Sequence, residues 1–319
     1  MRVLSRLLTL VLLLGLLGVA RAAEAPAEPA AADPLRPQRL STHVWLFQGL
    51  SAAGSRENRN NISNAGLIET PTGLVLVDAL GSPALARELL AAARVLSPKP
   101  LTHVLLTHYH ADHIYGLQVY KAAGAQIIAH EKGREYLNSE AAALRLAASI
   151  EEGLVEPGTR LVAADRWIDG ETELDLGGLR LQLIPVGPAH TPEDLAIWLP
   201  ADRLLFAGDL MFRGRIPFVG QADSRRWVAS LDRLLTRPAA IVVPGHGPAS
   251  TDARQDLLLT RDYLAYLRAT MGRAAREMTP FDEAYAATDW SRYEALPLFK
   301  LANRMNAYNT YLLMEQERE

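Results

Sequence analysis

The chain of 319 residues contains no cysteine. Disulfide bonds, a lipid-modified cysteine anchor, a cysteine nucleophile and thiolate metal ligands are therefore excluded. Hydrophobic residues make up 49% of the chain, which is enough for a substantial buried core. Stability must come from the packing of that core and from any bound metal.

Positive charge is also scarce. The chain has 33 Lys and Arg against 36 Asp and Glu, a formal charge of −3, and no basic block typical of nucleic-acid-binding proteins occurs. We therefore expect a small-molecule substrate as the partner, and no nucleic acid.

The chain has one long apolar run, from Leu7 to Gly18. It follows Arg2 and Arg6 and precedes Ala20-Arg21-Ala22, a small-x-small cleavage pattern. The run is shorter than the roughly 20 residues that cross a bilayer, which favours a secretory signal peptide over a membrane anchor. We predict a cleaved signal peptide over residues 1–22, a periplasmic or secreted location, and no stable membrane insertion after cleavage.

The remaining chain divides into three parts by composition. Residues 23–39 are rich in Ala and Pro without apolar periodicity, which predicts a flexible linker. Over residues 40–250, short apolar runs alternate with helical patterns, the order of an α/β domain. From Asp252 the patterns are long and amphipathic, so residues 251–319 are predicted to form a helical C-terminal extension. This extension could wall a pocket, form a dimer contact or pack on the core, and the oligomeric state stays open.

The expected elements follow from apolar periodicity and from turn residues at their ends. Strands are expected at 43–47, 65–69, 73–78, 103–107, 125–130, 179–185, 195–200, 203–208 and 239–245. Helices are expected at 83–96, 114–123, 131–150 and 223–235, the first starting on Ser82 as N-cap with Pro83 in its first turn.

The stretch "LLTHYHADH" (105–113) concentrates three of the eight histidines and an aspartate, namely His108, His110, Asp112 and His113. The polar set begins where a buried-strand run ends. Because ligands of open α/β sheets bind at the carboxyl ends of strands, a metal site is favoured over a surface accident or core histidines.

Three more candidate ligands follow later strand-like runs, each beside Gly or Pro: His190, Asp209 and His246. The full group comprises five histidines and two aspartates. Such nitrogen and oxygen donors suit two divalent ions, Zn²⁺ first, with Fe or Mn as alternatives because softness does not discriminate without sulfur.

The other histidines, His43, His103 and His130, lie in or beside strand-like runs, where a structural hydrogen bond is the simpler interpretation. Asp78 ends the run "GLVLVD". A carboxylate in this place is expected to orient the second ring nitrogen of a ligand histidine.

With "THYHADH", His190, Asp209 and His246 in this order, the chain resembles the metallo-β-lactamase fold superfamily over residues 40–250. The resemblance implies an αββα sandwich of two mixed sheets flanked by helices. It also implies a dinuclear site, in which His108, His110 and His190 hold one metal, Asp112, His113 and His246 hold the other, and Asp209 bridges them.

The subfamily motifs point in two directions. "HTPEDLAIWLP" (190–200) and "LLFAGDLMF" (204–212) resemble the zinc β-lactamases, but Asp209 and Phe212 stand where classical members have Cys and often Lys. Asp209 is similar to glyoxalase II-like thiolesterases and to periplasmic zinc metallohydrolases associated with sulfur-oxidation and quinoprotein systems. "GRIPFVGQADSRRW" (214–227), the helical extension and the export signal make the last group the nearest resemblance.

The implied chemistry is hydrolysis. Two divalent ions can share a water and provide hydroxide, which would attack an ester, thioester or amide-like carbonyl while Asp112 orients it as the catalytic residue. The alternatives are a β-lactamase, an iron-dependent sulfur-compound dioxygenase, which normally uses fewer ligands, and a non-catalytic metal- or ligand-binding protein.

Substrate contacts are less marked in the sequence. Arg213 and Arg215 could hold an anionic substrate in place of the missing Lys, or lie in a solvated loop. Tyr109 could line the pocket or pack in the core. Asn61 and Asn64 precede a strand, and we interpret them as turn residues.

Overall fold

The computed structural model describes residues 35–220 and 222–317. The predicted signal peptide and most of the predicted linker lie outside these residues. Within them, Pro37–Arg39 forms strand β1, which pairs antiparallel with β2 (Val44–Phe47). The fold therefore begins before residue 40, where we had placed the linker boundary. All three β1 side chains are exposed, so no apolar pattern marks the strand.

The first sheet has seven strands in the order β1-β2-β3-β4-β5-β6-β7. Its further members are β3 (Ala65–Thr70), β4 (Gly73–Val77), β5 (Leu101–Leu105), β6 (Gln126–His130) and β7 (Arg166–Ile168). Strands β1 to β4 pair antiparallel and β4 to β7 pair parallel, so the sheet is mixed.

The second sheet has five strands in the order β12-β11-β10-β9-β8. These are β8 (Thr172–Asp175), β9 (Arg180–Pro185), β10 (Leu195–Leu199), β11 (Leu204–Phe212) and β12 (Ile241–His246). Only β11 and β12 pair parallel. Strands β7 and β8 were not predicted, because they are short and mostly exposed and carry no apolar alternation.

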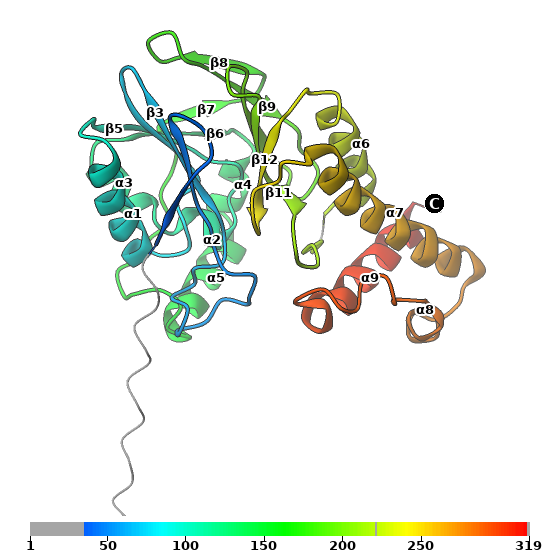
Figure 1. Cartoon of the computed structure of the whole chain (residues 1–319). Coiled ribbons are helices and arrows are strands. Elements are labelled where there is room, and N and C mark those ends of the chain that lie inside the picture. Colours follow the sequence, from blue (N-terminus) through cyan, green and yellow to red (C-terminus); the bar gives the residue numbers. More distant parts are fainter. Residues whose placement is uncertain (1–34, 221, 318–319) are drawn as a thin grey trace, which may run out of the picture. The chain divides into compact units, whose positions relative to one another are not determined.

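Helices cover the outer face of each sheet (Figure 1). The first sheet packs against α1 (Pro83–Leu96), α2 (Ala111–Ile114), α3 (Leu117–Ala122), α4 (Gly133–Leu137) and α5 (Glu140–Glu151). The second sheet packs against α6 (Ser224–Leu234) and α7 (Ala253–Glu277). A third apolar layer lies between the sheets, where Leu46, Val77 and Leu105 meet Leu183, Ile197 and Phe206. The predicted αββα sandwich is confirmed.

The predicted helix boundaries hold where capping residues mark them. The Ser82 hydroxyl accepts a hydrogen bond from Leu85 N at 3.3 Å, and Pro83 occupies the first turn of α1, as predicted. The single helix predicted over 131–150 is wrong. It is divided into α4 and α5, because Ser139 accepts from Ala142 N at 3.1 Å and starts a new helix there.

The C-terminal region is helical as predicted, with α8 (Phe281–Ala287) and α9 (Phe299–Gln316) following α7. The long helix α7 contributes Leu264, Leu267 and Met271 to the same apolar cluster as Leu210 and Trp227. The extension is thus part of the core on the outer side of the second sheet. Across residues 35–220 and 222–317, no helix combines the length and apolarity that crossing a bilayer requires.

Candidate metal centre

The loop between β5 and α2 carries His108 and His110, α2 carries Asp112 and His113, and Asp78 fixes the start of the loop. Asp78 follows β4 with a left-handed backbone (φ 62°) and accepts hydrogen bonds from Thr107 N and Thr107 Oγ1, both at 2.8 Å. The same carboxylate lies 2.9 Å from His113 Nδ1. The expected contact of Asp78 with a histidine ring nitrogen is therefore present, and it leaves His113 Nε2 directed into the site.

The structure brings all seven predicted ligands together in two groups. Within each group, one ligand atom per residue lies within 4.8 Å of the others. The first group comprises His108, His110, His190 and Asp209, and the second comprises Asp112, His113 and His246.

Asp209 lies between the two groups. Its Oδ2 is 3.3 Å from His190 Nε2 and 3.3 Å from His246 Nε2, while its Oδ1 is 3.3 Å from His113 Nε2. One carboxylate thus contacts imidazoles of both groups, which is the position of a bridging ligand.

The strand that carries Asp209 is irregular. Strand β11 runs on to Phe212, past the predicted end at residue 208, and its register with β12 shifts on both sides of Gly208. Gly208 has φ 54°, and a Cβ there would lie 2.7 Å from the Thr107 side chain. This bulge redirects Asp209 within the strand, whereas we had predicted that it followed the strand.

The donor atoms fit a metal site because several have no other partner. His108 Nε2, His113 Nε2 and Asp209 Oδ1 are buried and make no hydrogen bond. Buried polar atoms without partners are costly and therefore rare in native proteins. An imidazole and carboxylate set that points such atoms at one centre fits one or two divalent ions.

The electrostatics of the two groups differ. In the first, burial drives the pKa of His108 well below its ordinary value, and burial with the neighbouring His190 lowers that of His110 to about 3. In the second, burial acts to lower the pKa of His113, but Asp112, Asp209 and Asp78 outweigh it and raise that pKa well above the ordinary value. Burial opposes ionisation of Asp209, yet His246 and His113 hold its pKa well below the usual range.

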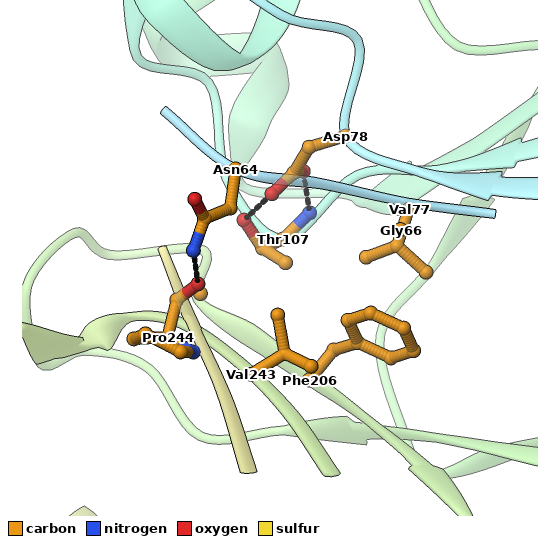
Figure 2. Close-up of a pocket in the computed structure, with 9 residues that line it drawn as sticks. Asn64, Gly66, Val77, Asp78, Thr107, Phe206, Val243 and Pro244 are labelled. Carbon is orange, nitrogen blue, oxygen red and sulfur yellow. Dashed lines mark hydrogen bonds between the residues drawn. The ribbon is translucent and has the colours of Figure 1, made fainter. Parts of the chain in front are cut away.

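Asn64 is a positioning residue that sequence reasoning missed. We had interpreted it as a turn residue, but it is buried and its Nδ2 donates to Pro244 O at 2.8 Å and Gly247 O at 2.7 Å. Figure 2 shows Asn64, Pro244 and the Asp78–Thr107 pair around one small cavity, with the Asn64 amide directed at Pro244. These bonds hold the chain on both sides of His246. An Asn before a strand is typical of turns, so no sequence signal indicated this contact.

Aromatic rings also fix two of the ligands. Phe212 stacks on His246 with centroids 5.1 Å apart and planes 6° apart. Trp227 lies edge-on to His190 at 5.1 Å and donates from Nε1 to Leu210 O at 3.1 Å. His246 Nδ1 donates a hydrogen bond to Ile62 O at 2.7 Å. The other ring nitrogen, Nε2, is therefore available to the site. The sequence did not predict that Phe212 packs on His246 or that Trp227 packs on His190.

Glu193 and Asp194 support the loops from the second sheet. Glu193 Oε1 accepts from Tyr109 N at 3.1 Å, which ties the ligand loop to the segment after His190. Asp194 accepts from Thr191 N at 2.7 Å and Thr191 Oγ1 at 2.8 Å. Burial raises the pKa of Asp194 to about 7.

The structure places the three predicted substrate-contact residues in different surroundings. Tyr109 is fully buried in the core, where its ring stacks on Trp167 at 5.8 Å, so it packs and does not line a pocket. Arg213 forms an ion pair with Asp256 at 2.7 Å and is not directed at the site. Arg215 is buried, with Nη1 3.4 Å from His246 Nδ1. Of the two arginine side chains, only that of Arg215 contacts a candidate ligand, although Arg213 N donates to His246 O at 3.0 Å.

Of the three other histidines, His103 and His130 make the structural hydrogen bonds expected of them, whereas His43 Nε2 lies near a carboxylate without a hydrogen bond. His43 Nε2 lies 3.1 Å from Asp202 Oδ2, His103 Nδ1 lies 2.9 Å from Thr102 Oγ1, and His130 Nδ1 accepts from Lys132 N at 3.2 Å. None of them belongs to either ligand group.

The seven-residue centre opens to solvent at Asp112 and His110, the two members that are partly exposed. The Asp112 side chain is 17% exposed, whereas that of Asp209 is 4% exposed and those of His108 and His113 are fully buried. Solvent therefore reaches the centre from the side of Asp112 and His110.

The comparison with protein families bears directly on this centre. A model described as the metallo-beta-lactamase superfamily matches residues 59–246, more than half of the chain. The chain belongs to this superfamily. The matched range includes all seven residues of the centre and ends on His246.

Curated relatives of this superfamily member include two hydrolase types. A linear primary-alkylsulfatase of Pseudomonas sp. (strain ATCC 19151) is 26% identical over 238 residues, which cover 63% of this chain and 45% of that protein. A metallo-beta-lactamase type 2 of Bacillus cereus is 29% identical over 231 residues, which cover 71% of this chain and 81% of that protein. The chain shares with both proteins the metallo-beta-lactamase superfamily, and its His/Asp centre lies within the matched range.

Solved structures share the fold to different extents. The sec-alkylsulfatase Pisa1 from Pseudomonas sp. matches with a TM-score of 0.70 at 20% identity, covering 88% of this chain and 50% of that one. A metallo-beta-lactamase from Pontibacter korlensis matches with a TM-score of 0.57 at 23% identity, covering 72% and 99%. The chain thus spans about half the length of the alkylsulfatases that it matches.

Proposed function

We propose that this chain is an exported, dinuclear metal-dependent hydrolase that acts on an ester, thioester or amide-like carbonyl of a small molecule. The position of Asp209 supports this proposal most directly, because its two oxygens contact imidazoles of both ligand groups. A bridging carboxylate is expected where two divalent ions lie a few ångströms apart.

The seven residues of the centre would bind two metal ions. His108, His110 and His190 would hold one ion, Asp112, His113 and His246 the other, and Asp209 both. When bound, such ions lower the pKa of a coordinated water towards neutrality and polarise a carbonyl. The low pKa of His108 and His110 keeps these imidazoles neutral, so that their lone pairs are available as ligands.

Asp112 is the residue we assign to the attacking water. Burial raises its pKa, but His113 and His246 outweigh that effect and lower the pKa, so the carboxylate is ionised at neutral pH. It is also the more exposed of the two carboxylates at the centre. Asp112 would orient the water, accept its proton and pass that proton to the leaving group.

Metal analysis of the purified protein tests the dinuclear assignment. We expect about two zinc ions per chain, since the donor set contains imidazole and carboxylate only. A single iron would contradict the proposal and favour the sulfur-compound dioxygenase. Iron or manganese at both positions would be consistent with the proposed hydrolase and would show that its metal is not zinc.

A substrate panel tests the reaction. Zinc-loaded protein is assayed with nitrocefin, a thioester, a lactone and an alkyl sulfate, with Asp112→Ala as the control for metal-dependent turnover. We expect hydrolysis of at least one ester-type member. If metal-replete protein turns over none of them, the chain is better described as a metal- or ligand-binding protein.

Sulfate ester hydrolysis is a second candidate, favoured by the C-terminal helices. The family match ends at residue 246, whereas the fold match with Pisa1 covers 88% of the chain against 72% for the metallo-beta-lactamase from Pontibacter korlensis. Coverage of 88% leaves about 38 residues of the chain unaligned, fewer than the 64 residues from 253 to 316, so at least part of α7 to α9 aligns. The alkyl sulfate assay decides between this candidate and carbonyl hydrolysis.

β-Lactam hydrolysis is less well supported by the site. Phe212 stacks on His246, so this position offers an aromatic face in place of a cation for a substrate carboxylate. The nitrocefin assay tests this alternative directly.

Export is tested separately from catalysis. Expression of the full chain followed by cell fractionation should recover the protein outside the cytoplasm, shortened by the predicted 22 residues. An uncleaved protein in the cytoplasm would contradict the predicted signal peptide without affecting the hydrolase.

A further inference from the structure

A second cavity, of about 460 Å³, lies beside the metal centre. It is bounded by the segment that follows β11, by helix α7 and by residues 292–296. Its apolar lining includes Leu259, Tyr263, Tyr293 and Leu296. None of the seven residues of the centre lines it. The volume falls in the range of about 300–1,000 Å³ that is typical of small-molecule sites.

Arg215 connects this cavity with the metal centre. It lines the cavity and, together with Phe212, contacts His246. The side of the cavity that carries Arg215 therefore faces the second ligand group. A ligand in the cavity that reaches Arg215 is next to the candidate metal ligands.

The Arg215 guanidinium lies over the Phe212 ring, 5.6 Å from its centroid, and forms no ion pair among residues 35–220 and 222–317. Its two polar contacts are long, at 3.4 Å to Ile216 O and 3.4 Å to His246 Nδ1. The second is not a true hydrogen bond, because His246 Nδ1 already donates its proton to Ile62 O. By contrast, two other arginines of the cavity, Arg213 and Arg292, pair with Asp256 and Asp262.

A buried cation without a counter-ion is costly. Arg215 is only 8% exposed. Burial lowers its pKa, while Asp209 and Asp112 act in the opposite direction. A guanidinium stays charged even under such a shift, so the charge remains ready for an incoming anion.

We propose that the cavity and Arg215 form the binding site for an amphiphilic substrate, with its apolar part in the cavity and an anionic group on Arg215. This inference rests on the proposed hydrolase. The anion is either the sulfate of a sulfate ester or a carboxylate next to another ester bond. In a carboxylate substrate the scissile ester bond would lie beyond Arg215, on the side of the metal centre. In a sulfate ester the scissile bond would be the one that joins the sulfate on Arg215 to the apolar part, next to His246.

Calorimetric titration of zinc-loaded protein tests the site without turnover. The probes are octane-1-sulfonate, octanoate, octan-1-ol and ethanesulfonate. We expect at least one of the two octyl anions to bind one per chain, about tenfold or more tighter than octan-1-ol, which lacks the charge. Ethanesulfonate should also bind more weakly, because it lacks the apolar part. Tighter binding of octane-1-sulfonate points to a sulfate ester, and tighter binding of octanoate points to a carboxylate.

Two variants separate the anion site from the apolar wall. Arg215→Gln should abolish the preference for the octyl anions over octan-1-ol, while Arg215→Lys should keep part of it. Leu259→Gln, at a half-exposed position, should weaken the octyl anions and octan-1-ol by the same factor. Arg261→Gln is the matched control, because this α7 arginine pairs with Asp232 outside the cavity.

The proposal is overturned if Arg215→Gln binds the octyl anions as tightly as the unchanged protein. It is also overturned if octan-1-ol binds as tightly as they do, or if neither octyl anion binds. Zinc content is measured for every variant, so that loss of binding with two zinc ions retained is attributed to Arg215. Arg215-dependent binding without turnover of any panel substrate would support the binding site and contradict the proposed hydrolase. Turnover without Arg215-dependent binding would support the hydrolase and contradict the binding site.

Discussion

The two ligand groups of the centre are built from the same residue types but in different environments. In the first, His108 and His110 are buried imidazoles whose pKa values fall, and Trp227 packs on His190. In the second, His113 lies among three carboxylates and its pKa rises. Burial keeps His108 and His110 neutral, whereas the carboxylates around His113 make it compete for protons, as Asp209 does to a smaller extent for His190 in the first group. Metal binding is therefore expected to be more sensitive to pH and to mutation in the second group.

The largest effect is expected for the residue that belongs to both groups. Asp209→Ala removes the carboxylate between them, so both ions should be lost or weakened and activity should fall on the order of 10³-fold or more, beyond the 10–100-fold typical of supporting residues. Zinc content and kcat/KM are measured together. Asp232→Ala, at the surface, is the control. Retention of two zinc ions by Asp209→Ala would contradict its place between the groups.

The next largest effect is expected for the support of the second group alone. Asp78→Ala removes the acceptor of His113 Nδ1 and of Thr107, and should lower metal affinity in that group by roughly 10–100-fold. Asp78→Asn keeps one acceptor and should cost less. Competition with a chelator measures the two affinities. Equal weakening of both groups would show that Asp78 supports the whole loop and not His113.

Acid should release the two ions in order. The pKa of His113 is raised, so this imidazole takes up a proton first as pH falls, and metal affinity drops by about tenfold per pH unit for each proton that competes. His108 and His110 have lowered pKa values and stay neutral to lower pH, although the pKa of His190 is raised by Asp209 against the effect of burial. Chelator titrations from pH 8 to pH 5 should therefore show loss from the second group first. Parallel loss from both groups would contradict this difference.

The smallest effect is expected at Tyr109, inside the ligand loop but outside both groups. Its hydroxyl makes only a 3.5 Å contact with Val162 O. Tyr109→Phe should change the free energy of unfolding by less than about 0.5 kcal/mol and leave kcat/KM unaltered. Thermal unfolding and a steady-state assay measure this. A tenfold loss of kcat/KM would restore the pocket-lining interpretation that the structure contradicts.

Much of the fold and the centre could be predicted from the sequence because the signals are local. Apolar periodicity marks the strands of both sheets, and Ser82-Pro83 marks the start of α1. The order "THYHADH", His190, Asp209 and His246 indicated the superfamily that the family match confirms. Residue type alone also excluded sulfur ligands, since the chain has no cysteine.

Errors arose where local patterns were weak. Strands β1, β7 and β8 are short and exposed, so they carry no apolar alternation. The continuation of β11 to Phe212 depends on a bulge at Gly208. A glycine is required there because the side chain of Thr107, about one hundred residues earlier in the chain, lies close to this backbone. Such contacts between distant segments leave no periodic trace.

The sequence by itself determined the donor chemistry, the α/β character of the domain and the helical C-terminal region, because residue type and periodicity are carried by each segment alone. The αββα architecture was implied by the resemblance to the superfamily. Only the tertiary structure decided which residues act together. It joined Asn64 to the residues around His246, separated the paired Arg213 from the unpaired Arg215, and turned Tyr109 into the core. These assignments depend on distances between segments far apart in the chain, which folding sets and a linear pattern does not contain.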